Sequence, residues 1–159
     1  MSRVLIIAYG NPLRCDDSVA WQAAEEIRRK VASAQAEIIC VHQLTPELAE
    51  QVSRADSVIF LDASRNGEPG KVTCEPVSSR AADLHFWHNL TPGSLLALGA
   101  QLYGPAPRAF CVSLCGESFD HGETLSPAVI QGLPRLVARV DELVSQLANA
   151  GVLSSVPAV

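Results

Sequence analysis

The sequence has few basic residues and no long apolar run, and each shortage excludes a class of protein. Its 159 residues include 12 lysines and arginines against 17 aspartates and glutamates, which gives a formal net charge of −5. Nucleic-acid-binding domains usually present a basic face, so we expect no nucleic-acid partner. The apolar stretch VLIIA near the start is too short for a signal peptide or a membrane span. We therefore expect a cytoplasmic protein with no membrane partner.

The cysteines form no recognisable metal or disulfide pattern. There are five of them, their spacings do not repeat, and no Cys-x-x-Cys pair occurs. Cys111 and Cys115 share one face of a strand-like run, too far apart to chelate a metal without other ligands. We therefore expect small buried hydrophobic side chains here. A P-loop and a G-x-G-x-x-G motif are also missing, which argues against nucleotide binding.

Apolar strands alternate with amphipathic helices along the chain. This alternation predicts an α/β fold: a single three-layer domain with a mostly parallel twisted sheet, helices on both faces and one edge strand. We expect this domain over 1–150, followed by a flexible tail over 151–159. The expected strands cover 4–9, 37–42, 57–61, 71–77 (the edge strand) and 108–114, and the expected helices cover 18–31, 46–53, 92–103 and 127–149.

Three of the expected helices start with a hydroxyl residue followed by proline. A serine or threonine at this place can accept hydrogen bonds from free backbone N–H groups, and proline fits the first turn because its missing N–H costs nothing there. We therefore expect helix N-caps at Thr45, Thr91 and Ser126.

Carboxylates follow two of the buried strands. Sites in parallel sheets form beyond the carboxyl ends of the strands, where the strand order reverses. Asp62 directly follows the apolar run VIFL and either caps the next turn or serves a site. Asp16 and Asp17 stand just before a helix, where an aspartate is a favoured cap. We expect one of this pair to cap the helix and the other to face the crevice.

Histidine His88 lies in the loop HFWHNLTP and should reach the same edge of the sheet, with His85 three residues earlier. Two carboxylates and an imidazole form a mixed oxygen and nitrogen ligand set, which suits a borderline divalent ion such as nickel or zinc. Of the other two histidines, His42 ends the second expected strand and His121 lies in the loop GESFDHGE, where a lone histidine is usually a solvated polar residue.

Four segments together resemble the endopeptidases that mature the large subunit of nickel–iron hydrogenases. They read YGNPLRCDDSVA, VIFLDAS, HNLTPGSLLALGAQLYG and GESFDHGETLSP, and the resemblance runs from residue 4 to about 145. It implies a peptidase with an α/β fold that removes a C-terminal peptide from the nickel-loaded large-subunit precursor. The partner is then that precursor, and the metal is nickel delivered by the substrate.

By this resemblance the second acid of the first motif is Asp17, and the strand acid is Asp62. Both are expected to be catalytic and to contact nickel, together with His88; His85 is the reserve for the histidine. In some members the histidine follows the cap directly, where this chain has Gly93. Many members also carry glycines at three positions of the first loop, which are occupied here by Cys15, Ser18 and Ala20.

Two other functions are compatible with parts of this pattern. A non-catalytic hydrogenase assembly factor of the same fold would explain the replaced glycines. A phosphorelay receiver domain also has acids after its first and third strands. That chemistry needs a lysine after the last strand, however, and the only lysines are Lys30 and Lys71.

Overall fold

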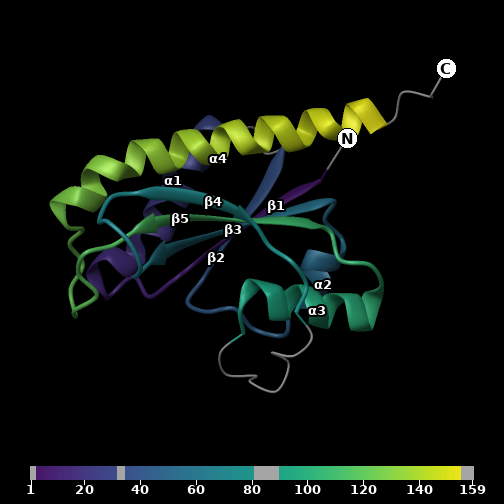
Figure 1. Ribbon diagram of the computed structural model, residues 1–159, viewed down its shortest axis with the longest axis horizontal. Helices are drawn as coiled ribbons and strands as arrows, with labels where there is room; N and C mark the ends of the chain where they lie inside the picture. Colours follow the sequence, from purple (N-terminus) through teal and green to yellow (C-terminus); the bar gives the residue numbers. More distant parts are fainter. Residues whose placement is uncertain (1–2, 32–34, 81–89, 155–159) are drawn as a thin grey trace.

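A five-stranded sheet forms the centre of the molecule (Figure 1). The computed structural model describes residues 3–31, 35–80 and 90–154. The parallel strands are β1 (Val4–Tyr9), β2 (Ala36–Val41), β3 (Ser57–Ser64) and β5 (Arg108–Cys115). The remaining strand, β4 (Val72–Pro76), pairs antiparallel with β5, so the order across the sheet is β2-β1-β3-β5-β4.

Helices cover both faces of this sheet. The described residues form a short 3-10 helix and four α-helices: η1 (Cys15–Ser18), α1 (Val19–Lys30), α2 (Leu48–Ser53), α3 (Pro92–Tyr103) and α4 (Pro127–Ser154). In Figure 1, α1 and α4 lie above the sheet, and α2 and α3 lie below it. The predicted fold class, one α/β domain of three layers with a mostly parallel sheet and one edge strand, is confirmed. Among the helices described, none is long and apolar enough to cross a membrane.

Two strand boundaries differ from expectation and affect the site. β3 continues to Ser64 instead of ending at residue 61, because residues 62–64 pair with residues 113–115 of β5. Asp62 therefore lies inside the strand, between two neighbours, and does not cap a turn. β2 ends at Val41, so that His42 is the first residue beyond its carboxyl end.

The last helix is longer than predicted. α4 runs to Ser154 instead of residue 149, and it crosses the boundary at 150 where a tail was expected to begin. Alanine is the strongest helix former, and Ala148 and Ala150 continue the helix across a single glycine at 151.

The hydroxyl-proline signature identifies a capped helix start at one of its three positions. Thr91 caps α3: its side chain accepts from the N–H of Ser94, whose own hydroxyl accepts from the N–H of Thr91. Thr45 is not a cap, because α2 begins only at Leu48 and its capping residue makes no side-chain bond. Ser126 precedes α4 as expected, but its hydroxyl donates to the carboxylate of Asp16.

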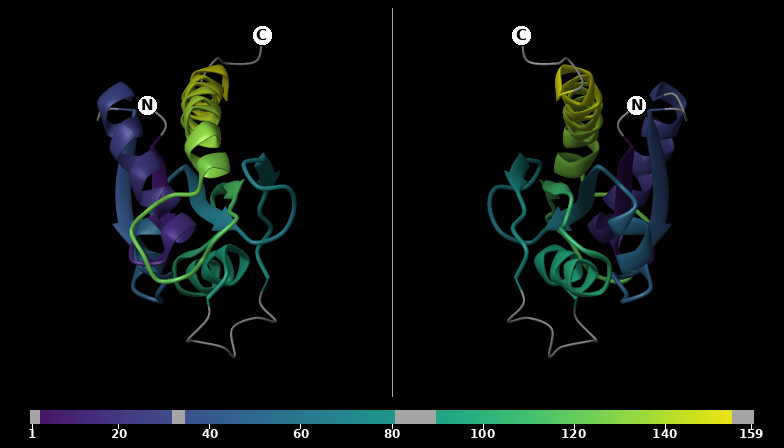
Figure 2. Two further views of the ribbon diagram at one scale, coloured as in Figure 1. Left: turned by 90° about the vertical axis from the view of Figure 1, so that its left-hand side faces the viewer. Right: turned by 90° about the vertical axis from the view of Figure 1, so that its right-hand side faces the viewer.

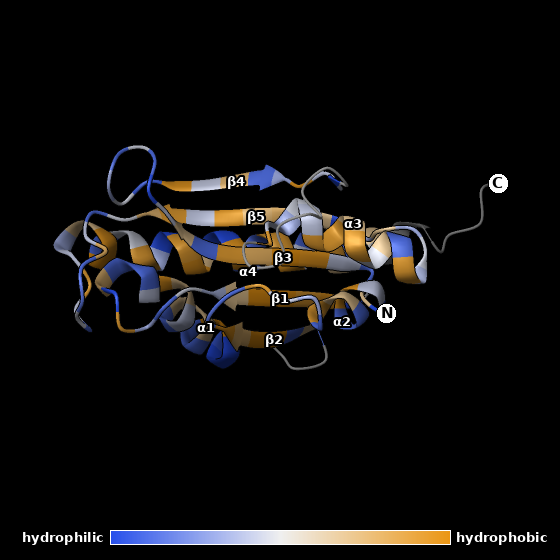
Figure 3. Ribbon diagram, turned by 90° about the horizontal axis from the view of Figure 1, so that it is seen from below, coloured by the Kyte–Doolittle hydropathy of each residue, from blue (hydrophilic) through white to orange (hydrophobic). Residues whose placement is uncertain are grey.

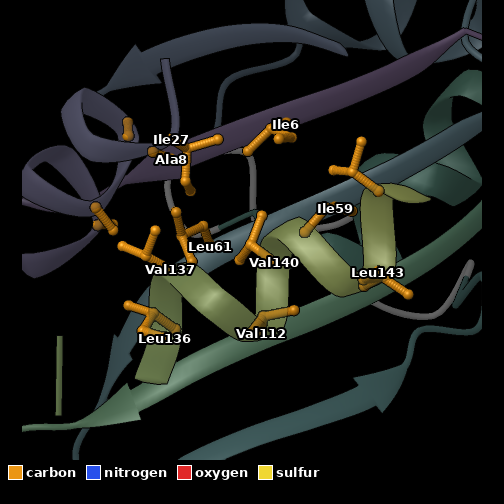
Figure 4. Close-up of a cluster of buried hydrophobic side chains, with 14 of the residues drawn as sticks. Ile6, Ala8, Ile27, Ile59, Leu61, Val112, Leu136, Val137, Val140 and Leu143 are labelled. Carbon is orange, nitrogen blue, oxygen red and sulfur yellow. The ribbon is translucent and has the colours of Figure 1, made fainter. Parts of the chain in front are cut away.

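Each face of the sheet has its own hydrophobic core. Alternate strand residues point to opposite faces. Ile6, Ile59 and Val112 pack with α1 and α4, as Figure 4 shows. Ile7 and Phe60 pack with α2 and α3 on the other face. Apolar colour accordingly covers much of β1 and β3 in Figure 3. The alternation places Asp62 on the same face as Phe60, beside α2 and α3.

α4 lies close against β5 and the loop before β4 at Gly132. A Cβ atom added there would lie 2.8 Å from the carbonyl oxygen of Gly70 and 2.7 Å from Cδ1 of Leu114. The Gly70 carbonyl is also fixed from the helix side, because it accepts a hydrogen bond from Arg135 at 3.0 Å. The helix therefore needs a residue without a side chain at this position.

We expect Gly132→Ala to lower the free energy of unfolding by roughly 1–3 kcal/mol through overpacking. The usual effect of this change inside a helix has the opposite sign, a stabilisation of about 1 kcal/mol. Urea unfolding followed by far-UV circular dichroism measures the difference. Gln131→Ala, at the exposed neighbouring position, is the control, and a Gly132→Ala variant more stable than the parent would contradict the close contact.

Candidate active site

The strand order reverses between β1 and β3, and a cavity opens there. β1 leads through α1 to β2 on one side, while β3 lies on the other side of β1. Figure 2 (left) looks onto the edge where the parallel strands end. The cavity has a volume of about 340 Å³ and is lined by Tyr9, Gly10, Asp17, His42, Gln43, Leu44, Asp62, Ala63, Leu90 and Thr91. Ligands of parallel sheets bind at such a switch point.

Asp62 is held by donors from both neighbouring strands. The hydroxyl of Tyr9, on β1, donates to its Oδ2 at 2.8 Å. The hydroxyl of Ser113, on β5, donates to its Oδ1 at 2.5 Å, and the thiol of Cys111 contacts the same oxygen at 3.8 Å. A carboxylate has about four acceptor positions, so these three donors leave one direction for a group in the cavity.

The groups around Asp62 keep their protons, while Asp62 itself is harder to ionise. Burial raises the pKa of Asp62, the three donors lower it in part, and the charge of Asp17 raises it. Burial and the Asp62 charge raise the pKa of Tyr9 far above its usual range. Burial, followed by the Asp62 charge, raises the pKa of Cys111 to about 12, so this thiol is not a nucleophile at neutral pH.

Asp17 also lines this cavity. Its Oδ2 accepts a hydrogen bond from the backbone N–H of Asn11 at 2.6 Å. Gly10 allows this approach: it has φ of +148°, and a Cβ there would lie 2.2 Å from the Asp17 carbonyl oxygen. The Gly-Asn pair of the first motif thus shapes the loop that presents Asp17.

Asp16, next to it, has a different function. It is 0% exposed and does not cap its own helix. Its carboxylate accepts hydrogen bonds from the N–H groups of Glu117, Ser118 and Ser126 and from the Ser126 hydroxyl, at 2.7–2.9 Å. The expectation that one acid of the pair caps the helix is therefore wrong. Asp16 ties the loop after β1 to the loop after β5, which ends with the start of α4.

Cys15, Ser18 and Ala20, which stand where many members of the family have glycine, all fit into the structure. Cys15 adopts φ of +44°, the left-handed conformation that glycine favours. Ser18 closes the 3-10 turn by donating to the Cys15 carbonyl at 2.7 Å. Ala20, in the first turn of α1, is fully buried in the core. The loop therefore keeps a glycine-like shape with a strained cysteine.

The predicted histidine His88 and its reserve His85 lie outside the described residues. The alternative position, Gly93, is closed: an added Cβ would lie 2.8 Å from the Ser78 carbonyl oxygen. Over the ranges 3–31, 35–80 and 90–154, no three His, Cys, Asp or Glu side chains are close enough together to hold a metal ion.

His42 lines the cavity and was missed as a site residue in the sequence. It follows the end of β2 and packs edge-on against Trp21, with ring centroids 5.4 Å apart and an interplanar angle of 88°. The Trp21 indole N–H donates to the Val41 carbonyl at 3.2 Å, which fixes the ring pair to the strand end. The available signal was its position: it follows a parallel strand just as the acids do.

A second cavity of about 340 Å³ lies at the opposite edge, near the amino ends of β1 and β2. Its wall includes Arg3 and Arg54, but Arg54 forms an ion pair with Glu50. Parallel sheets place their sites at the carboxyl edge. The cavity with Asp17 and Asp62 is therefore the candidate active site.

The Asp16 bonds predict a pH-dependent contribution to stability. Burial opposes ionisation, but the four hydrogen bonds outweigh it and lower the pKa of Asp16 below 3.8. Their stabilisation is present above that value and is lost as pH falls through the lower folded-state pKa. We expect Asp16→Asn to lower the free energy of unfolding by about 3 kcal/mol at pH 7, because four part-buried hydrogen bonds lose their charged acceptor.

Urea unfolding of parent and Asp16→Asn across pH checks this. The difference in free energy of unfolding between the two proteins should stay constant around neutral pH and become smaller only below about pH 3.8. Asp120→Asn, exposed in the same loop, should change stability by less than about 0.5 kcal/mol. A pH-independent gap would contradict the bonding to an ionised Asp16.

Asp62 predicts the opposite pH dependence. Its pKa is raised in the folded state, so the parent loses stability as pH rises from the ordinary value of 3.8 through the folded-state pKa. We expect Asp62→Asn to be at least as stable as the parent at pH 7 and to lose this advantage near pH 3.8. Thermal unfolding of the two proteins at both pH values measures it, and a strongly destabilised Asp62→Asn at pH 7 would contradict it.

Comparisons with known proteins found matches among solved structures. No protein-family model matches the chain, and no curated protein matches it by sequence. The hydrogenase maturating endopeptidase HybD from Escherichia coli superimposes with a TM-score of 0.73 and 19% identity, covering 91% of this chain and 93% of that one.

Two archaeal structures are similarly close. A [NiFe] hydrogenase maturation protease HybD from Thermococcus kodakarensis gives a TM-score of 0.69 at 22% identity, over 89% of this chain and 99% of the other. A hydrogenase 2 maturation peptidase from a Thaumarchaeota archaeon gives 0.68 at 20% identity, over 91% and 99%. Over nearly its whole length, this chain has the fold of these hydrogenase maturation endopeptidases.

Proposed function

We propose that this protein is an endopeptidase that removes a C-terminal peptide from the nickel-loaded large-subunit precursor of a nickel–iron hydrogenase. One observation carries the proposal: Asp17 and Asp62, far apart in the sequence, line one cavity at the switch point of the sheet. The fold shared with hydrogenase maturation endopeptidases supports the interpretation of that cavity as a peptidase active site. The segments quoted from the sequence support the same reading. A cytoplasmic location is part of the proposal.

Peptide hydrolysis needs an activated water and stabilisation of the charge that develops on the carbonyl oxygen. Cys111 keeps its proton, so the cavity favours attack by water over attack by this thiol. A carboxylate is an efficient base when its pKa lies near the working pH. Burial raises the pKa of Asp62 toward neutral pH, which makes Asp62 the better candidate for the base.

Nickel enters this proposal as part of the substrate. Carboxylate oxygens from Asp17 and Asp62 and an imidazole from His88 would contact the ion carried by the precursor, and Asp17 offers an oxygen beyond the one bonded to Asn11. Contact with the ion would make cleavage conditional on successful metal insertion. An aspartate-dependent, nickel-recognising endopeptidase is thus the proposed activity.

A second candidate is a binding factor of the same fold that does not cleave. The strained Cys15 favours it, because a left-handed cysteine makes the loop stiffer than a glycine would. The phosphorelay interpretation receives no support, since Asp16 is tied to the loop after β5 and does not line the cavity.

The test is cleavage of the nickel-loaded large-subunit precursor from the same organism, followed by mass spectrometry. We expect Asp17→Asn and Asp62→Asn to slow cleavage by at least about 100-fold, the usual contribution of a positioned acid or base. His88→Ala should also slow it, whereas His85→Ala should not. Asp141→Asn, exposed on α4, is the matched control.

Each alternative gives a different result in this assay. A stable complex with an uncut precursor would support the binding factor. Normal cleavage by all three variants at Asp17, Asp62 and His88 would show that the site is assigned wrongly.

A further inference from the structure

The proposed hydrolysis so far has no residue assigned as proton donor to the leaving nitrogen. When the peptide C–N bond breaks, the leaving nitrogen must gain a proton. A separate general acid beside the base can supply it directly, so that the base does not have to pass on the proton it took from water. The proton donor has to reach the same cavity as Asp17 and Asp62. The described cavity wall contains four titratable side chains, namely Tyr9, Asp17, His42 and Asp62.

Tyr9 is not available as that donor. Its hydroxyl proton is committed to Asp62 Oδ2 at 2.8 Å, and burial raises its pKa. Releasing this proton would create a buried phenolate beside a carboxylate. Asp62 is the proposed base and Asp17 a proposed contact to nickel, so neither is assigned as the separate donor. Of the four, this leaves His42, whose imidazole ring can both give and take a proton at its nitrogens.

The position of His42 suits proton delivery. It stands at the end of β2, next to β1, and so faces the cavity from the side away from β3. Trp21 supports one edge of the ring, and the indole is itself bonded to the strand-end carbonyl of Val41. His42 is exposed, so it can regain a proton from solvent after each turnover.

We infer that His42 is the general acid of this site and protonates the leaving amine of the scissile peptide bond; the inference rests on the proposed protease function. Water bonds to the carbonyl carbon while a carboxylate takes one of its protons. The C–N bond then breaks, its electron pair stays on nitrogen, and the imidazolium of His42 gives that nitrogen a proton. The carboxylic acid returns its proton to the imidazole through water, which restores both groups.

The experiment compares His42→Gln and His42→Ala with the parent on the nickel-loaded precursor. We expect kcat to fall by about 100-fold or more for both, with KM changed by less than about threefold, because the donor acts on the reacting bond. Added imidazole should restore part of the activity of His42→Ala and leave Asp62→Asn inactive. His121→Gln, an exposed loop histidine, is the matched control.

The outcomes separate the two hypotheses. If the parent never cuts the precursor, the proposed function fails, and the role of His42 fails with it. If the parent cuts and His42→Gln cuts at the same rate, the inference about His42 alone is overturned. A fall in kcat without imidazole rescue, accompanied by a loss of stability in urea unfolding, would make His42 a structural residue and also overturn it.

Discussion

The buried carboxylate of Asp16 joins the two loops on which the site depends. It belongs to the loop after β1, while all its donors belong to the loop after β5 and the start of α4. β3 lies between those two strands, so the sheet itself does not bring their loops together. A charged, buried acceptor with four donors resists displacement, because every donor would lose its partner at once. Because Asp16 is fixed, the next residue, Asp17, is held so that its side chain lines the cavity.

The site concentrates features that work against stability. Asp62 brings a carboxyl group into a sheet face that otherwise carries residues such as Phe60, and Cys15 holds a backbone conformation that disfavours a side chain. Such features persist where the surrounding structure enforces them. Here the enforcing structure is the pair of hydrophobic cores and the hydrogen bonds from Tyr9 and Ser113. At Asp62 the proposed function therefore requires a buried carboxyl group that lowers the stability of the fold.

Local signals made the fold predictable, and distant contacts limited the prediction of the site. Strand and helix periodicity located each strand and α-helix of the described residues, with some ends shifted, but not the 3-10 helix η1. The cap at Thr91 lies within its own turn. The partners of Asp16 come from a hundred residues further along the chain, which no local pattern indicates. For the same reason the sequence suggested a cap at Asp16 or Asp17, where the structure has a tie between loops. His42 was overlooked because a single loop histidine is ordinary until neighbouring strands place it beside two acids.

The spacing of the two acids in η1 limits how the loop before α1 can vary in length. Successive residues of a 3-10 helix are turned by about 120°, so adjacent side chains leave in different directions. Inserting or deleting one residue ahead of η1 would rotate the wrong acid toward the cavity and leave the other without its donors. The number of residues between β1 and α1 is therefore as restricted as their identity, and any change in that number requires a matching change after β5.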